Sequence, residues 1–412
     1  MSLIRPLKGL RPRQDKAADV VAPPYDVLNT EEARVRVQGR PLSFLHISKP
    51  EIDLPVGTDP YDAAVYEKGA TNLQKLIDDG VLIQDEEPCY YAYRLIMGEQ
   101  EQTGLVVVAN VEDYDSNRIR KHEFTRPDKE DDRVRQIDAL NVQTGPVFLT
   151  YRHHDDVDAL VQLVVQGDPE YDLTADDGVK HTLWKICDAD KVSTLTGIFD
   201  AMDCLYIADG HHRSAAASRV AAMRKNDNAA HTGDEPYNYF LSVIFPDDQM
   251  KILDYNRVVK DLNNLSDDDF IKKIAASFDI AESDEPVKPA RPGQVGMFMK
   301  GQWYKLDIHA DKVPSDDPVG RLDVSLLANN LIDPILGISD PRRDKRIDFV
   351  GGIRGLKELE KRVNSGEMAV AFSLYPTRLS DLMSVADINE VMPPKSTWFE
   401  PKLADGLVSH KL

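Results

Sequence analysis

A ten-residue stretch near the middle of the chain, Leu205-Tyr-Ile-Ala-Asp-Gly-His-His-Arg-Ser214, holds the side chains best suited to chemistry. Its apolar first half predicts a strand, Gly210 permits a sharp turn, and the Ala-rich residues that follow predict a helix. The first turn of a helix presents unpaired N–H groups at its positive end, where anions bind. His212 and Arg213 add donors, and an arginine can direct two hydrogen bonds at one phosphate. The pattern predicts a nucleotide-phosphate site.

The acidic residue of this turn, Asp209, would repel a bare phosphate. Three roles suit its carboxylate: orienting a histidine such as His211, capping the helix, or binding a Mg²⁺ ion that accompanies a nucleotide. The alternative interpretation is a capped surface helix with two hydrogen-bonded histidines. Four polar residues around a glycine at a strand-to-helix turn favour the functional interpretation.

A second polar segment, Asn117-Arg-Ile-Arg-Lys-His-Glu-Phe-Thr-Arg126, begins a basic stretch that continues to Arg135. Residues 118–135 contain seven Lys/Arg and five Asp/Glu, a positive surplus in an acidic chain. Glu123 within this cationic surround could act as a base on a hydroxyl group. A zinc-protease motif is excluded because Arg126 stands where the second histidine would be needed. The alternative is a solvated basic helix face.

A third segment, Pro393-Pro-Lys-Ser-Thr397, lies near the C-terminus. A lysine and two hydroxyl groups after a proline-fixed turn suit anion binding by Lys395, Ser396 and Thr397. They suit an exposed turn equally well, so the residues leave both interpretations open.

The surrounding pattern indicates an α+β fold with two or three domains. The first 60 residues are rich in proline and predict an extended segment wrapped on another part of the chain. Helical spacing follows over residues 60–80, and strands are predicted at 89–97, 103–111, 204–208 and 239–245. We divide the chain into an N-terminal region (1–103), a core that carries the Asp209–Arg213 turn (104–228) and a C-terminal α/β region that returns to the site (229–412).

The composition of the chain indicates the cellular compartment in which the protein is found. Its three cysteines lie far apart, which argues against a disulfide framework or a zinc ribbon and for a reducing compartment. The N-terminus does not read as a secretory signal, and no apolar stretch is long enough to span a membrane. The sequence therefore predicts a cytoplasmic protein without membrane contact, and it leaves the oligomeric state open.

The net charge of −20 predicts that the protein does not bind nucleic acids specifically. Any weak complex with DNA should dissociate steeply as the salt concentration rises, because only non-specific contacts to phosphates would hold it. A mobility-shift assay at physiological salt tests this prediction, and a sequence-specific complex would contradict it.

The sequence resembles a bacterial protein family of unknown function in the ParB/sulfiredoxin-like superfamily. The segments that carry this resemblance are Arg5-Pro-Leu-Lys-Gly-Leu-Arg-Pro12, Ala22-Pro-Pro-Tyr-Asp-Val27, Ser43-Phe-Leu-His46, Asp209-Gly-His-His-Arg213 and Pro394-Lys-Ser-Thr397. More distantly, the chain is similar to the archaeal free L-serine kinase of that superfamily. The resemblance implies a ParB/sulfiredoxin-like core with an added N-terminal segment and a C-terminal α/β region.

The same resemblance implies roles for individual residues. Glu123 matches the catalytic glutamate of the kinase, and Asp209 and His211 match its shared turn. His212, Arg213 and Thr144 would contact the nucleotide, as would the C-terminal segment Lys395–Thr397, in which Ser396 replaces a threonine. The cofactor implied is ATP or ADP with Mg²⁺.

These residues and the resemblance support a small-molecule kinase that transfers phosphate from ATP or ADP to a hydroxyl metabolite, free L-serine being favoured. A sulfiredoxin-type redox enzyme is excluded, because His211 stands where its cysteine would be needed. A ParB-like DNA-binding protein lacks a basic recognition helix here. A nucleotide-binding regulatory protein without turnover remains the alternative.

Overall fold

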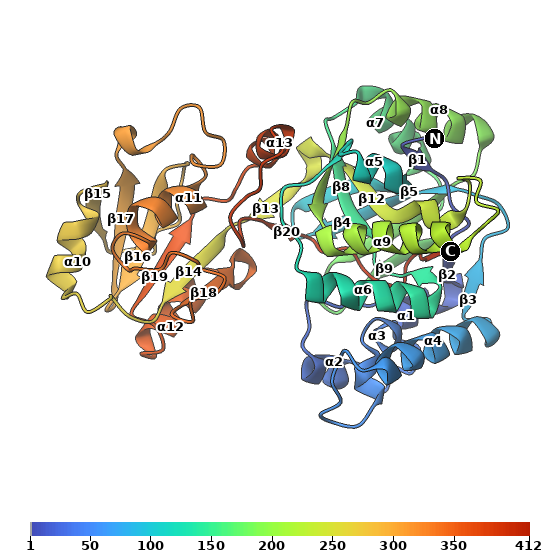
Figure 1. Cartoon of the computed structure of the whole chain (residues 1–412), viewed down its shortest axis with the longest axis horizontal. Coiled ribbons are helices and arrows are strands. Elements are labelled where there is room, and N and C mark those ends of the chain that lie inside the picture. Colours follow the sequence, from blue (N-terminus) through green and yellow to red (C-terminus); the bar gives the residue numbers. More distant parts are fainter. Residues whose placement is uncertain (1) are drawn as a thin grey trace. The chain divides into compact units, whose positions relative to one another are not determined.

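The computed structural model describes residues 2–412. The chain forms two compact units, of which the first comprises residues 1–250 and 401–412 and the second residues 251–400 (Figure 1). Helices and largely antiparallel sheets are mixed along the chain, which confirms the predicted α+β class. Among the described residues, no helix is long and apolar enough to cross a membrane.

A nine-stranded sheet forms the centre of the first unit. All neighbouring strands are antiparallel except for the pairs β6–β11 and β8–β12, which are parallel. Strand β1 (Ile4–Arg5) pairs with β5 but stands outside the main strand order. The other eight strands lie in the spatial order β6 (Ile119–Arg120), β11 (Leu205–Asp209), β8 (Val147–Tyr151), β12 (Tyr239–Pro246), β5 (Gln100–Asn110), β4 (Tyr90–Met97), β10 (Lys180–Ile186) and β9 (Tyr171–Thr174).

Helix α9 (His211–Asp227) links this sheet to a second helix, α6 (Pro127–Leu140). Its residues Ala215, Ala217 and Ala221 belong to the same apolar cluster as the sheet. Ala216 and Val220 instead form a cluster with Val134 and Ile137 of α6. Small alanine side chains let the helix approach both neighbours closely, so its N-terminus is held between the end of β11 and the segment before α6. The remaining helices of this part are α5 (Val111–Asp115), α7 (Asp155–Val164) and α8 (Ala189–Asp200).

The proline-rich N-terminal segment forms short elements rather than one extended strip. With helix α4, they form an apolar cluster that includes Phe44, Leu45 and Leu73 and that also takes in Leu140 and Val142. These elements are β2 (Leu10–Pro12), α1 (Ala17–Val20), α2 (Thr30–Arg36), α3 (Leu45–Ser48), α4 (Ala63–Asp78) and β3 (Leu82–Gln84). Helix α4 ends just before Gly80, as the sequence predicts, and this glycine adopts a positive φ of 65°.

The last twelve residues return to the first unit. Backbone bridges join Leu10 to Ser409 and Ala22 to Asp405. Strand β21 (His410–Lys411) pairs with β7 (Val142–Gln143). The C-terminal segment therefore lies beside residues from the very beginning of the chain. The sheet takes strands from all three regions predicted from the sequence, and that three-part division stays a prediction.

The wide spacing of the cysteines argues against a disulfide framework, but Cys89 and Cys187 form a disulfide. Cys89 directly precedes β4, and Cys187 directly follows β10. The antiparallel pairing of these strands sets Tyr90 opposite Ile186, so the two cysteines meet at the end of the ladder with their Cα atoms 4.5 Å apart. A separation of 98 residues conceals this proximity in the sequence.

The second unit contains a six-stranded antiparallel sheet and a two-stranded sheet of β13 (Lys251–Leu253) and β20 (Trp398–Glu400). The strands of the larger sheet, in spatial order, are β15 (Phe278–Ser283), β17 (Gln302–Ile308), β16 (Gln294–Met299), β19 (Val370–Leu374), β14 (Tyr255–Val259) and β18 (Ile347–Gly351). Its helices are α10 (Asp267–Ile274), α11 (Asp323–Leu327), α12 (Leu356–Asn364) and α13 (Leu379–Asp387).

Candidate functional site

The turn between β11 and α9 has the geometry that the sequence predicts. Gly210 precedes the helix with a φ of 103°, a conformation that side chains with a Cβ rarely adopt. No side chain caps the helix, so Asp209 does not have the capping role considered above. In any α-helix, the backbone N–H groups of the first turn have no acceptor within the helix. Those of α9 can therefore donate hydrogen bonds to an anion.

Arg213 folds back over this turn. Its guanidinium donates a hydrogen bond to the carbonyl of Pro146, and its Nη2 atom lies 3.9 Å from Asp209 Oδ2. A Cβ added at Gly210 would lie 3.1 Å from Arg213 Nε, so the absence of a side chain there makes room for the guanidinium. The Arg213 side chain is only 12% exposed, so the surrounding residues hold its guanidinium near the N-terminus of α9.

Asp209 is neutralised by two cations rather than left to bind a metal. Lys402, from the C-terminal segment, donates a hydrogen bond of 3.1 Å to Asp209 Oδ2. Burial by itself would raise the pKa of Asp209, but Lys402 and Arg213 outweigh burial and hold the pKa well below its ordinary value. Because these cations already occupy its surroundings, Asp209 does not fit the role of a magnesium ligand.

The two histidines of the turn contact the segment that contains Glu123. His211 Nε2 accepts a hydrogen bond of 3.4 Å from the backbone N–H of His122, and His212 Nε2 accepts one of 3.1 Å from Arg126. The rings of His122 and His211 are perpendicular, with centroids 4.5 Å apart. Burial lowers the pKa of His211 well below its ordinary value, so this ring is neutral at physiological pH.

Glu123 lies beside this histidine pair. Its Oε2 atom is 3.8 Å from His211 Nδ1, and its side chain is 49% exposed. Glu123 does not lie on a helix, because it falls between β6 and α6. The structure therefore brings three predicted residues, Glu123, Asp209 and His211, to the same end of β11 and α9, and it does not support the basic-helix alternative for Glu123.

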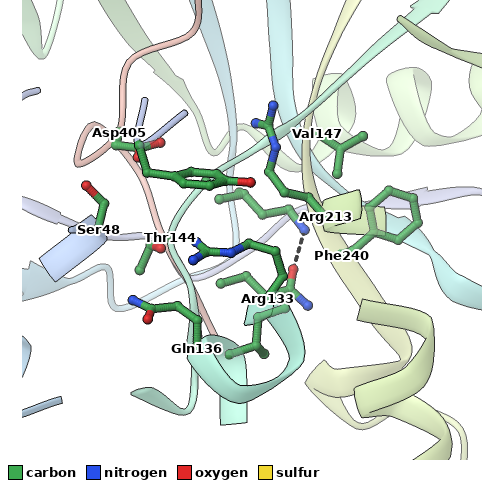
Figure 2. A pocket seen from close by; sticks show the side chains of 13 residues that line it. Ser48, Arg133, Gln136, Thr144, Val147, Arg213, Phe240 and Asp405 are labelled. Atoms are coloured by element: carbon green, nitrogen blue, oxygen red, sulfur yellow. Dashed lines mark hydrogen bonds between the residues drawn. The ribbon is translucent and has the colours of Figure 1, made fainter. Parts of the chain in front are cut away.

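Arg213 also lines a cavity, and Figure 2 shows the side chains around it. Thr144 and Arg213 were predicted as site residues, and both line it. A Cβ added at Gly145 would lie 3.4 Å from both Arg213 Cδ and Asp405 Oδ1, so this glycine lets the three segments meet. The cavity is lined by Tyr25, Ser48, Arg133, Gln136, Ile137, Gln143, Thr144, Gly145, Val147, Arg213, Phe240, Leu241 and Asp405.

Two polar atoms in the cavity wall are buried without a hydrogen-bond partner: Ser48 Oγ and Asp405 Oδ1. Buried polar groups are usually satisfied, so unsatisfied ones in a cavity point to a polar occupant. Arg133 adds a second cation, whose guanidinium lies 4.0 Å from the centre of the Tyr25 ring. Burial raises the pKa of Asp405 to about 7, although Arg213 opposes this effect.

Sequence reasoning missed several residues of this site. Arg133 lies within the basic stretch, whose pattern does not distinguish it from its neighbours, and Lys402 and Asp405 carry no local pattern. Tyr25 and Ser48 come from the N-terminal segment, whose Pro-Pro-Tyr-Asp run carries part of the family resemblance. That run, together with the expectation that the segment wraps on another part of the chain, was the signal that could have pointed to Tyr25.

The predicted residues Lys395, Ser396 and Thr397 belong to the second unit. Ser396 Oγ donates to the carbonyl of Pro393, and the carbonyl of Lys395 accepts from Arg257. The hydroxyl and backbone groups thus stabilise a local turn, in which Lys395 has a positive φ of 58°. A contribution of this segment to a nucleotide site stays a prediction.

A family model described as "Protein of unknown function (DUF1015)" matches residues 4–325. The chain belongs to this family. The match covers the whole Asp209–Arg213 turn and the segment of Glu123, and it ends before the C-terminal residues Lys402 and Asp405. A search of curated proteins found no match.

Three solved structures are similar to this member of the DUF1015 family at low identity. A free serine kinase in complex with AMP is 12% identical, with a TM-score of 0.36, and the match covers 73% of this chain and 92% of that one. A conserved hypothetical protein from Pyrococcus furiosus is 15% identical (TM-score 0.35; 74% and 94% covered). SbnI with a C-terminal truncation from Staphylococcus aureus is 10% identical (TM-score 0.38; 74% and 86% covered). TM-scores of this size do not establish a shared fold, and membership in the ParB/sulfiredoxin-like superfamily stays a prediction.

Proposed function

We propose that this protein is a phosphotransferase that binds the phosphates of ATP or ADP at the β11–α9 turn and phosphorylates a small hydroxyl metabolite. The observation that carries the proposal is the cavity that Arg133 and Arg213 both line, next to the N-terminus of α9. Phosphoryl transfer needs charge neutralisation and positioning more than covalent chemistry from the protein. Two buried guanidinium groups and a helix N-terminus supply both.

In this proposal, Glu123 accepts the proton of the acceptor hydroxyl. Its carboxylate is half-exposed and lies 3.8 Å from a neutral histidine, His211, so it is accessible to a substrate and held in place on one side. His212 and Arg213 bind the phosphates, and Thr144 contacts the nucleotide from the cavity wall. Mg²⁺ would accompany the nucleotide as its usual counter-ion, without Asp209 as a ligand.

We favour free L-serine as the acceptor and O-phosphoserine as the product, on the motif resemblance alone. The test is incubation of the full chain with ATP, ADP or CTP and a panel of small hydroxyl metabolites, with detection of phosphorylated product by mass spectrometry. Serine-dependent phosphoserine formation is expected. Nucleotide binding without any product would favour a non-catalytic nucleotide-binding regulator, and absence of nucleotide binding would contradict the proposal.

The pKa of Asp405 predicts that nucleotide affinity depends on pH. Above pH 7 its carboxylate is charged and repels an anion in the cavity, whereas protonation below pH 7 removes that repulsion. ADP should therefore bind more tightly at pH 6 than at pH 8, by roughly two- to tenfold. Calorimetric titration of wild type and Asp405→Asn measures this effect.

The Asp405→Asn variant also serves as the control for the titration of ADP itself. The ligand loses or gains the same protons with either protein, so only the difference between their pH profiles belongs to Asp405. At pH 8 the variant should bind ADP roughly two- to tenfold more tightly than wild type, and at pH 6 the two affinities should converge. Parallel pH profiles for the two proteins would remove Asp405 from the phosphate site.

A further inference from the structure

Three side chains beside the β11–α9 turn form a cluster with the composition of a metal site. His122, Glu123 and His211 each offer one ligand atom, and these atoms lie within 4.8 Å of one another. Two ligand atoms at about 2.1 Å from a tetrahedral ion are about 3.4 Å apart. The separation of 3.8 Å between His211 Nδ1 and Glu123 Oε2 is close to that value. Glu123 is half-exposed, so its carboxylate can close the remaining gap.

A second, independent observation comes from His122, one of whose ring nitrogens has no partner. The side chain is 2% exposed, and its Nδ1 atom is buried without a hydrogen-bond partner. The ring also hydrogen-bonds to the backbone carbonyl of Ile207. A carbonyl accepts, so Nε2 donates and Nδ1 keeps its lone pair. Metal-bound histidines are held in this way, with the second ring N–H donated to a carbonyl.

His211 completes the donor set. Its Nε2 atom accepts from the backbone N–H of His122, so the neutral ring carries its proton on Nδ1, on the side of Glu123. Coordination of a metal ion by Nδ1 would move the ring proton to Nε2, so the long hydrogen bond of 3.4 Å from the His122 N–H would be given up. Exposure of Glu123 provides the path by which an ion can enter.

We propose that His122, Glu123 and His211 bind one divalent transition-metal ion of the series from Mn²⁺ to Zn²⁺. Two imidazoles and one carboxylate are the ligands these ions take when further coordination positions stay open. Magnesium and calcium prefer all-oxygen sites, so the donor set selects against them. The proposal does not rest on the phosphotransferase activity.

The experiment uses the full chain after treatment with a chelator. Co²⁺ is titrated without nucleotide, and binding is followed by calorimetry and by the visible absorption of the ion. One Co²⁺ per chain is expected, with an absorption band typical of four or five ligands. Glu123→Gln should weaken binding by at least about 10-fold, since loss of even an outer-shell partner costs metal sites about 10- to 100-fold.

A surface histidine outside the cluster, His153, provides the matched control. Its ring lies 3.0 Å from Asp155 and 3.1 Å from Asp248. His153→Ala should leave Co²⁺ affinity unchanged. Loss of binding in His153→Ala with full retention in Glu123→Gln would overturn the proposal, as would the absence of stoichiometric Co²⁺ binding by wild type. His211→Ala, with circular dichroism as a check of folding, is a further variant expected to lose the ion.

Discussion

Glu123→Gln is expected to reduce the rate of phosphoserine formation by about 10²–10⁴, the usual contribution of a positioned general base. The substitution keeps the size of the side chain but removes its ability to accept the proton of the acceptor hydroxyl. Nucleotide affinity should persist or improve, because a negative charge leaves the neighbourhood of the phosphates. The measurement is the initial rate of wild type and variant at saturating nucleotide, with affinity determined in parallel by calorimetry.

Glu99→Gln is the matched control for this experiment. Glu99 is exposed in the turn between β4 and β5, and it does not line the cavity. This variant should turn over like wild type. Excess Mn²⁺ should not restore the rate of Glu123→Gln, because a bound ion does not replace the missing base. Equal rates for Glu123→Gln and wild type would rule out the catalytic role of this residue.

Arg213→Ala is expected to weaken nucleotide binding by roughly 10- to 100-fold. A charge-assisted hydrogen bond is worth about 1.5–3 kcal/mol, and this cation lies at the junction of the cavity and the helix N-terminus. Calorimetric titration with ADP measures the loss. Arg213 also contacts the Pro146 carbonyl and Asp209, so circular dichroism and thermal unfolding must show that the variant is folded.

Arg219→Ala provides the comparison on the same helix. Arg219 forms ion pairs with Glu130 and Asp131, and its side chain is 44% exposed, so its loss removes a surface cation without altering the cavity. Its affinity for ADP should remain within about twofold of wild type, because exposed ion pairs contribute little. Unchanged affinity in a folded Arg213→Ala variant would remove Arg213 from the nucleotide site.

The local features of this protein can be predicted from its amino-acid sequence. A strand, a turn and a helix are predicted from the apolar run before Asp209, the glycine after it and the alanines that follow. The structure has β11, the turn at Gly210 and α9 at these positions. The helix that ends before Gly80 and the strand pair β4–β5 follow in the same way. Such elements are encoded by periodicity and by turn residues within a few positions of one another, so they are visible without knowledge of the fold.

The surroundings of the predicted residues, in contrast, depend on the tertiary structure. Lys402 neutralises Asp209 from 193 positions away, and Asp405 reaches the cavity because the C-terminal segment pairs with Ala22. The pairing of β4 with β10 brings Cys89 to Cys187 in the same manner. Each of these contacts depends on which strands become neighbours in the sheet. That choice is set by burial of apolar surface over the whole unit, and no local pattern of residues records it.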